Sequence, residues 1–265
     1  MVRDLLIRGM IAGVVAGLLC FGVAKLFGEP QVDRAIAFEE AHPKSEDQAA
    51  AEHHGMAGMT EPSQDNGKVE LVSRKVQSTF GLLTAVVVYG AAMGGLFALT
   101  FAFLYGRVGE VNPRLLALLL ALAAFAALYY VPSLKYPANP PAIGEPDTIA
   151  YRTGLYLLMM LISLAAMVFA VATARRLADR VDSLNATLVG AALFIGIIVI
   201  AQVVLPDINE VPADFPAVAL WRFRMASLGM QSVTWGSLGL IFGVLAESLL
   251  ESRYRSLSLA DVRNG

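Results

Sequence analysis

Residues 115–134 read LLALLLALAAFAALYYVPSL, a run of 20 residues that contains no Asp, Glu, Lys or Arg. A helix needs about 20 mainly apolar residues to cross the hydrocarbon core of a bilayer. In lipid, only helices and closed barrels satisfy every backbone N–H and C=O group, and the sequence lacks the short alternating segments of a barrel. The run therefore predicts a transmembrane helix.

Five further runs are also free of charged residues, and they cover residues 9–24, 76–106, 153–174, 183–206 and 225–246. The run 9–24 is the shortest, and it spans a bilayer if Arg8 and Lys25 extend their charged ends toward the headgroups. The alternative is a cleaved signal peptide, although no clear small-x-small cleavage site follows. The sequence thus predicts an all-α polytopic membrane protein with six transmembrane helices.

The composition supports this class and excludes others. Apolar residues make up 57% of the chain and charged residues 16%, against about 45–50% and about 25% in soluble domains. The net charge of −2 implies no nucleic-acid partner. Cys20 is the single cysteine, which excludes a disulfide framework. No nucleophile–base constellation is visible, so we expect no enzyme and no permanently bound cofactor.

Basic residues set the expected orientation, because they concentrate on the cytoplasmic side of membrane proteins. Ten of the 20 Lys and Arg residues fall on the side of the two termini and the short connections. We therefore expect both termini on the cytoplasmic side of the membrane. The expected divisions are a first transmembrane helix (1–27), an acidic outer loop (28–78) and a five-helix bundle (79–265) with outer loops at 135–152 and 207–224.

This order of spans predicts three hairpins, each closed by an outer connection. The second and third outer loops are both rich in proline and acidic residues, and each ends in an aromatic–arginine pair, Tyr151-Arg152 and Trp221-Arg222. One interpretation is a parallel internal repeat of the last two hairpins, as in many transporters. The other is that any outer loop collects such residues.

Glycines recur at four-residue spacing inside the spans, where small residues let helix backbones approach closely. This pattern predicts packing within the bundle or contact between copies of the chain, and it involves Gly9, Gly13, Gly17, Gly90, Gly94, Gly239 and Gly243. A separate short amphipathic helix is expected over residues 29–40, at the outer surface.

The candidate metal ligands lie in the outer connections. All three histidines fall in the first loop, close to two methionines, and imidazole and thioether groups suit cobalt, nickel, copper or zinc. Acidic residues of the other loops add oxygen ligands. The set is His42, His53, His54, Met56, Met59, Asp147, Asp207, Glu210 and Asp214. The alternative is a solvated linker in which the histidines have no role.

Three arginines, Arg152, Arg222 and Arg224, stand at the expected outer mouth of the bundle. They are predicted to pair with the carboxylates of the loops. The alternative for each is an anchor to lipid headgroups.

Several motifs resemble the CbtA family of predicted cobalt transporter subunits. These are LIRG (6–9), AFEE (37–40), YPANPPAIG (136–144), YRTGLY (151–156), LPDINEVPADFP (205–216) and WRFR (221–224), with Gln231 and Trp235. The resemblance covers nearly the whole chain. It implies an inner-membrane protein for cobalt uptake, linked to cobalamin synthesis, and a small single-span partner, CbtB.

Three hypotheses follow for the function. The first is a transporter subunit for divalent cobalt, or for nickel, zinc or copper, with the lipid bilayer and a CbtB-like subunit as partners. The second is a membrane scaffold that binds a partner and moves nothing. The third is a permease for a small organic anion that uses Arg152, Arg222 and Arg224.

Overall fold

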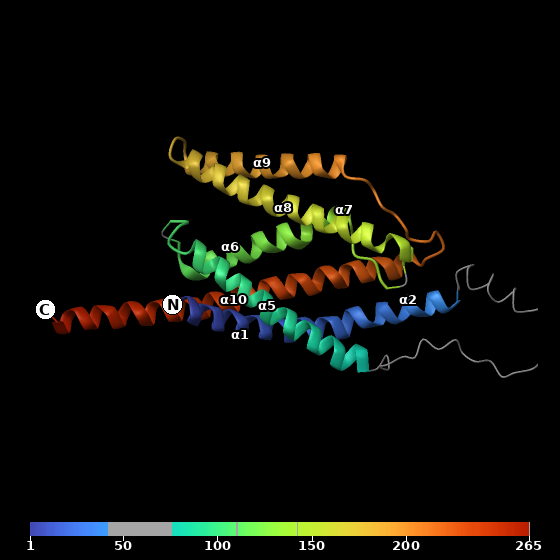
Figure 1. Cartoon of the computed structure of the whole chain (residues 1–265), viewed down its shortest axis with the longest axis horizontal. Coiled ribbons are helices and arrows are strands. Elements are labelled where there is room, and N and C mark those ends of the chain that lie inside the picture. Colours follow the sequence, from blue (N-terminus) through green and yellow to red (C-terminus); the bar gives the residue numbers. More distant parts are fainter. Residues whose placement is uncertain (42–75, 110, 142, 265) are drawn as a thin grey trace, which may run out of the picture.

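The computed structural model describes residues 1–41, 76–109, 111–141 and 143–264, and within these ranges the regular structure is entirely helical (Figure 1). Six helical stretches in the described part of the chain are long and apolar enough to cross a membrane. They are Val2–Ala41, Ser78–Leu104, Pro113–Lys135, Ile149–Ala178, Ser183–Val204 and Ala217–Ser252. The predicted all-α fold with six transmembrane helices is therefore confirmed.

The first span is longer than the sequence indicated. Helix α1 (Val2–Val23) continues through a π-helical turn (Ala24–Gly28) into α2 (Glu29–Ala41). The helix expected over residues 29–40 is thus present, but it prolongs the first span instead of forming a separate element (Figure 1). Its buried residue Ala35 belongs to a small apolar cluster with Phe215, and this contact holds the extension against the bundle.

Two π-helical turns have a common cause in the sequence. Proline has no N–H to donate to the carbonyl four residues earlier. For Pro30 that carbonyl belongs to Leu26, inside the turn Ala24–Gly28, and for Pro132 it belongs to Leu128, inside the turn Ala126–Tyr130. The Tyr156 hydroxyl lies 3.5 Å from the Leu128 oxygen and donates to it. Each helix therefore passes its proline by widening one turn.

The remaining α-helices are α5 (Leu82–Leu104), α6 (Pro113–Phe125), α7 (Val131–Lys135), α8 (Ile149–Ala178), α9 (Ser183–Val204) and α10 (Ala217–Asn264). A third π-helical turn (Gln77–Gly81) precedes α5, and a short 3-10 helix (Pro146–Thr148) precedes α8. The long helix α10 packs against α1 and α6, α1 packs along α5, and α8 pairs with α9. The connections 136–148 and 205–216 lie at one end of the bundle, here called the loop end (Figure 1). The turns 105–112 and 179–182 lie at the other, here called the turn end.

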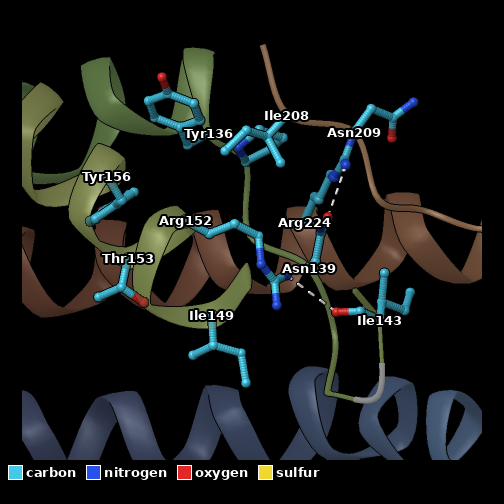
Figure 2. A pocket seen from close by; sticks show the side chains of 11 residues that line it. Tyr136, Asn139, Ile143, Ile149, Arg152, Thr153, Tyr156, Ile208, Asn209 and Arg224 are labelled. Atoms are coloured by element: carbon cyan, nitrogen blue, oxygen red, sulfur yellow. Dashed lines mark hydrogen bonds between the residues drawn. The ribbon is translucent and has the colours of Figure 1, made fainter. Parts of the chain in front are cut away.

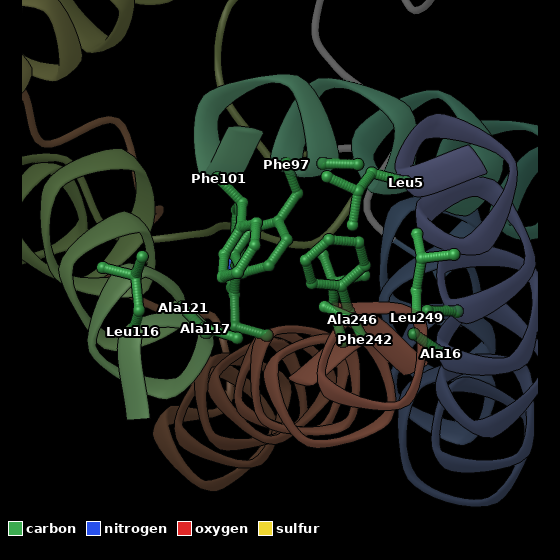
Figure 3. Close-up of a cluster of buried hydrophobic side chains, with 14 residues drawn as sticks. Leu5, Ala16, Phe97, Phe101, Leu116, Ala117, Ala121, Phe242, Ala246 and Leu249 are labelled. Carbon is green, nitrogen blue, oxygen red and sulfur yellow. The ribbon is translucent and has the colours of Figure 1, made fainter. Parts of the chain in front are cut away.

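The main core lies between α1, α5, α6 and α10 (Figure 3). Its centre is Phe242, whose ring meets the rings of Phe97 and Phe101 edge to face at centroid distances of 5.4 and 5.1 Å. A second cluster joins α7, α8 and α9 around Met159 and Ile198. The helix α9 packs on α8 and has no comparable interface with α10. The three hairpins and the parallel repeat stay predictions.

The glycines singled out by their spacing lie where helix backbones touch. Gly9, Gly13 and Gly17 on α1 face Gly94, Gly90 and Val86 on α5 so closely that an added Cβ would collide with backbone atoms. A Cβ on Gly239 of α10 would lie 2.6 Å from the Cβ of Ala121 on α6, and one on Gly243 would lie 3.3 Å from the Cβ of Ala117. Close backbone approach substitutes for side-chain interdigitation in both interfaces.

A polar network closes the turn end. The Asn112 side chain caps α6 by accepting from the Arg114 N–H at 2.8 Å, with Pro113 in the first turn. The Asn112 amide donates to a carboxylate oxygen of Glu247 at 3.1 Å, and Arg114 forms an ion pair with Glu247, whose side chain is 13% exposed. Glu247 therefore fastens α10 to the start of α6.

Replacement of Glu247 by alanine is expected to lower the free energy of unfolding by about 1–3 kcal/mol, because Asn112 and Arg114 both lose their partner. Thermal unfolding of the detergent-solubilised protein measures this. The matched control is Glu251→Ala, one helical turn further along α10, where the side chain is exposed. Equal stability of the two variants would contradict a role for the network.

Candidate binding cavity at the loop end

The two proline-rich connections and the beginnings of α8 and α10 line a partly open cavity of about 350 Å³ (Figure 2). The side chains that line it come from α8, α10 and both connections. They are Tyr136, Pro137, Asn139, Ile143, Ile149, Arg152, Thr153, Tyr156, Ile208, Asn209 and Arg224. The cavity is called the loop-end cavity below.

Prolines and a packed aromatic pair hold the connections in place. Proline fixes its own φ and restricts the residue before it, and the Pro140 and Pro212 carbonyls each accept a turn hydrogen bond, from Ile143 at 3.4 Å and Phe215 at 3.1 Å. The Phe215 ring meets Phe38 of α2 edge to face at 4.9 Å. The extended first span therefore packs against the connection 205–216.

One ion pair joins the beginning of α8 to the connection 205–216. Arg152 Nε lies 3.2 Å from Glu210 Oε2, and the two side chains are 25% and 19% exposed. The same carboxylate oxygen accepts from the Glu145 N–H at 2.9 Å, and Arg152 donates to the Glu145 carbonyl at 3.3 Å. Most of the charge on Arg152 is therefore compensated within the protein.

Gly144 makes this arrangement possible. Its φ of +104° lies in a region that L side chains rarely adopt. An added Cβ would also lie 2.7 Å from Glu210 Oε2. Only glycine fits both the backbone and the space beside the ion pair.

A second polar link fastens the third and fifth spans. Lys135 forms an ion pair with Asp207 and donates to the Gln202 carbonyl at 2.8 Å. The Tyr136 hydroxyl donates to the Pro206 carbonyl at 2.9 Å. Burial raises the pKa of Tyr136, against the opposing effect of Lys135, so the phenol keeps its proton and remains a donor at neutral pH.

Arg224 reaches the same cavity from α10 (Figure 2). Its guanidinium donates to Asn139 Oδ1 at 3.0 Å and to the Ala138 carbonyl at 3.4 Å. Within the described ranges no carboxylate forms an ion pair with Arg224, in contrast to Arg152. Arg222 is exposed and lines a separate groove between α10 and the first span.

The predicted metal ligands divide into two groups. His42, His53, His54, Met56 and Met59 lie outside the described residues. Of the four carboxylates, Asp207 and Glu210 pair with Lys135 and Arg152, whereas Asp147 and Asp214 are exposed at the surface. Among the described residues, no three His, Cys, Asp or Glu side chains come together as a metal site.

The six apolar spans and the polar cavity at their loop end define a polytopic α-helical membrane protein with a cavity of the size that binds small molecules. The family model of CbtA, described as a probable cobalt transporter subunit, matches residues 2–247. The chain therefore belongs to the CbtA family. No curated protein and no solved structure matches the chain.

Sequence reasoning did not identify several parts of the cavity. It missed Asn139, Tyr136 and Thr153, which are neutral and carry no charge signal, and it missed Lys135 as the partner of Asp207. Gly144 offered a signal, since glycine after a run of prolines is typical of a turn with positive φ. The pairing partners lie 58 to 72 residues apart, a separation at which sequence spacing says nothing.

Proposed function

We propose that this protein is the membrane-spanning subunit of a cobalt uptake system in the bacterial inner membrane, and that the imported ion supplies cobalamin synthesis. The observation that carries the proposal is the family match over residues 2–247 together with six helices able to span a membrane. A transport role also accords with the six apolar spans and with the cavity at their loop end, which polar side chains help to line.

The distribution of charge supports an orientation with both termini in the cytoplasm. Arginines gather at the turn end, where the positive-inside rule favours the cytoplasmic side. They are Arg3, Arg8, Arg107, Arg114, Arg175, Arg176 and Arg180. The loop end then faces outward, and the end of α2 lies toward it (Figure 1). The histidine-bearing segment follows α2 in the sequence.

In this proposal the segment 42–75 gathers the metal ion outside the membrane. Its histidines and methionines supply nitrogen and sulfur ligands for divalent cobalt, and related ions such as nickel, zinc and copper compete for the same groups. The carboxylates of Asp147 and Asp214 add oxygen ligands at the surface of the loop end. The cobalt ion is the substrate and not a resident cofactor.

The family description as a subunit supports a partner. We propose a small single-span protein of the CbtB type, which would lie beside the bundle in the bilayer. Contact between copies of the chain is a further option, since many apolar side chains of α5, α8 and α9 face outward from the bundle.

Uptake of radiolabelled Co²⁺ by cells tests the role of the histidines. The double variant His53→Ala/His54→Ala is expected to reduce uptake about 10-fold at sub-saturating Co²⁺, the smaller end of the loss seen when metal sites lose supporting groups. The matched control is Ser63→Ala/Gln64→Ala in the same segment. Unchanged uptake in the histidine variant would remove these residues from the transport route.

Proteoliposomes separate the transporter from a scaffold. The purified protein, reconstituted with and without its single-span partner, is expected to give Co²⁺ flux in at least one of the two preparations. A scaffold that only binds a partner gives none in either. Flux in the preparation that lacks the partner would also show that this chain transports by itself.

A further inference from the structure

The loop-end cavity has the wrong polarity for a bare metal cation. Of the described residues that line it, two are arginines, and none is Asp, Glu, His or Cys. The carboxylate of Glu210, which pairs with the lining residue Arg152, also accepts from the Glu145 N–H. A divalent cation entering here would meet guanidinium groups and no free anionic ligand, which is unfavourable by Coulomb's law.

The positive charge of Arg224 lies beside the cavity and has no carboxylate as ion-pair partner among the described residues. Its only hydrogen-bond partners among the described residues are a neutral amide oxygen and a backbone carbonyl. It projects from the second turn of α10, within a stretch long and apolar enough to span a membrane. A partly buried cation without an ion-pair partner is costly to desolvate, so an anionic ligand beside Arg224 would be favourable.

The start of α8 adds to the positive potential. Ile149, Arg152 and Thr153, all in the first turns of that helix, line the cavity. The first N–H groups of a helix have no partner within the helix and carry a partial positive charge. The N-cap residue Thr148 makes no side-chain capping bond to them, because its hydroxyl donates to the Glu145 carbonyl at 3.0 Å.

Neutral and apolar side chains complete the lining. The amides of Asn139 and Asn209 and the hydroxyl of Thr153 offer hydrogen-bond donors, and Ile143, Ile149 and Ile208 offer a surface for carbon atoms. A volume of about 350 Å³ lies at the small end of ligand pockets, which run from about 300 to 1,000 Å³.

We infer that the loop-end cavity binds a small organic oxyanion of the carboxylate type, with Arg224 as its main charged contact. Guanidinium groups bind carboxylates through two parallel hydrogen bonds. The carboxylate could arrive free or as the chelator of a metal ion, since both present the same oxygen atoms to Arg224. This inference goes beyond the proposed uptake of cobalt and does not depend on it.

Calorimetric titration of the purified full-length protein with citrate tests the inference. Wild type is expected to bind citrate saturably, and Arg224→Gln is expected to weaken binding at least about 10-fold, the loss that follows removal of a charged hydrogen-bond donor. The matched control Arg222→Gln removes the same charge two residues away, outside the cavity, and it is expected to change affinity less than about 2-fold.

Further titrations identify the form of the ligand and exclude misfolding of the variant. A higher affinity for citrate loaded with Co²⁺ than for citrate alone would assign the chelate, and equal affinities would assign the free anion. Arg224→Lys keeps the charge and is expected to bind with intermediate affinity, which a misfolded variant would not. The inference is overturned if wild type binds neither citrate, succinate nor phosphate, or if Arg224→Gln and Arg222→Gln bind citrate equally well.

Discussion

Replacement of Gly13 by leucine is expected to lower the free energy of unfolding by about 3 kcal/mol, the upper part of the usual range for overpacking. Gly13 on α1 faces Gly90 and Gly94 on α5, and even one added carbon would collide with the Gly90 carbonyl. The colliding atoms belong to the backbone, so no side-chain rotation relieves the contact. The two helices must separate, and the packing around Leu5 and Phe97 in the main core would loosen with them.

Gly22→Leu provides the matched control for this prediction. It lies on the same helix, and an added Cβ there meets no atom within 4 Å. Helix propensity favours leucine over glycine in both positions, so any difference between the variants reports the interface. Thermal unfolding in detergent measures it. A Gly13→Leu variant as stable as Gly22→Leu would mean that α1 and α5 do not meet as described.

The ion pair between Arg152 and Glu210 is expected to produce the second large effect. Glu210→Gln should cost about 2 kcal/mol of stability, below the 3–5 kcal/mol of fully buried pairs because both side chains keep some exposure. The guanidinium of Arg152 loses its ion-pair partner, and the N–H of Glu145 loses its charged acceptor. Arg152→Gln should cost a similar amount.

The double variant distinguishes a specific pair from two independent losses. If the two charges stabilise each other, Arg152→Gln/Glu210→Gln is less destabilised than the sum of the single variants, and the coupling energy is of order 1 kcal/mol or more. Asp147→Asn, at an exposed carboxylate of the connection 136–148, should leave stability unchanged. Additive single effects, measured by thermal or chemical unfolding, would contradict the ion pair.

The position of the ion pair has a functional consequence. It joins the beginning of α8 to the connection 205–216 beside the loop-end cavity. Glu210 was predicted as a metal ligand and Arg152 as an arginine of the outer mouth, and the structure pairs the two. A carboxylate that is held by an arginine and a backbone N–H is less available to a cation, which accords with the anion site inferred above. Metal binding by Glu210 stays a prediction.

The sequence by itself determined the number of spans and their class, since hydropathy is a local property and six uncharged runs are visible without any knowledge of packing. It indicated close helix contacts through glycine spacing, but not that Gly13 meets Gly90 while Gly243 meets Ala117. Its motifs carried the CbtA resemblance, which the family match over residues 2–247 confirms.

The end of the first span was harder to predict. Charged residues after Phe27 suggested that the helix stops, yet it continues to Ala41. The reason is that hydropathy reports where lipid ends, whereas a helix continues as long as its backbone bonds and packing allow. Here the π-helical turn accommodates Pro30, and contacts of Ala35 and Phe38 with Phe215 hold the extension.

Only the tertiary structure decided which charges are compensated. Arg152 and Arg224 look alike in the sequence, because each follows an aromatic residue near the start of a span. In the fold Arg152 meets Glu210, whereas Arg224 meets an amide and a carbonyl. The difference arises from contacts between segments 58 and 85 residues apart. Such contacts depend on how whole helices pack, so the cavity and its charge emerge only when the spans are assembled.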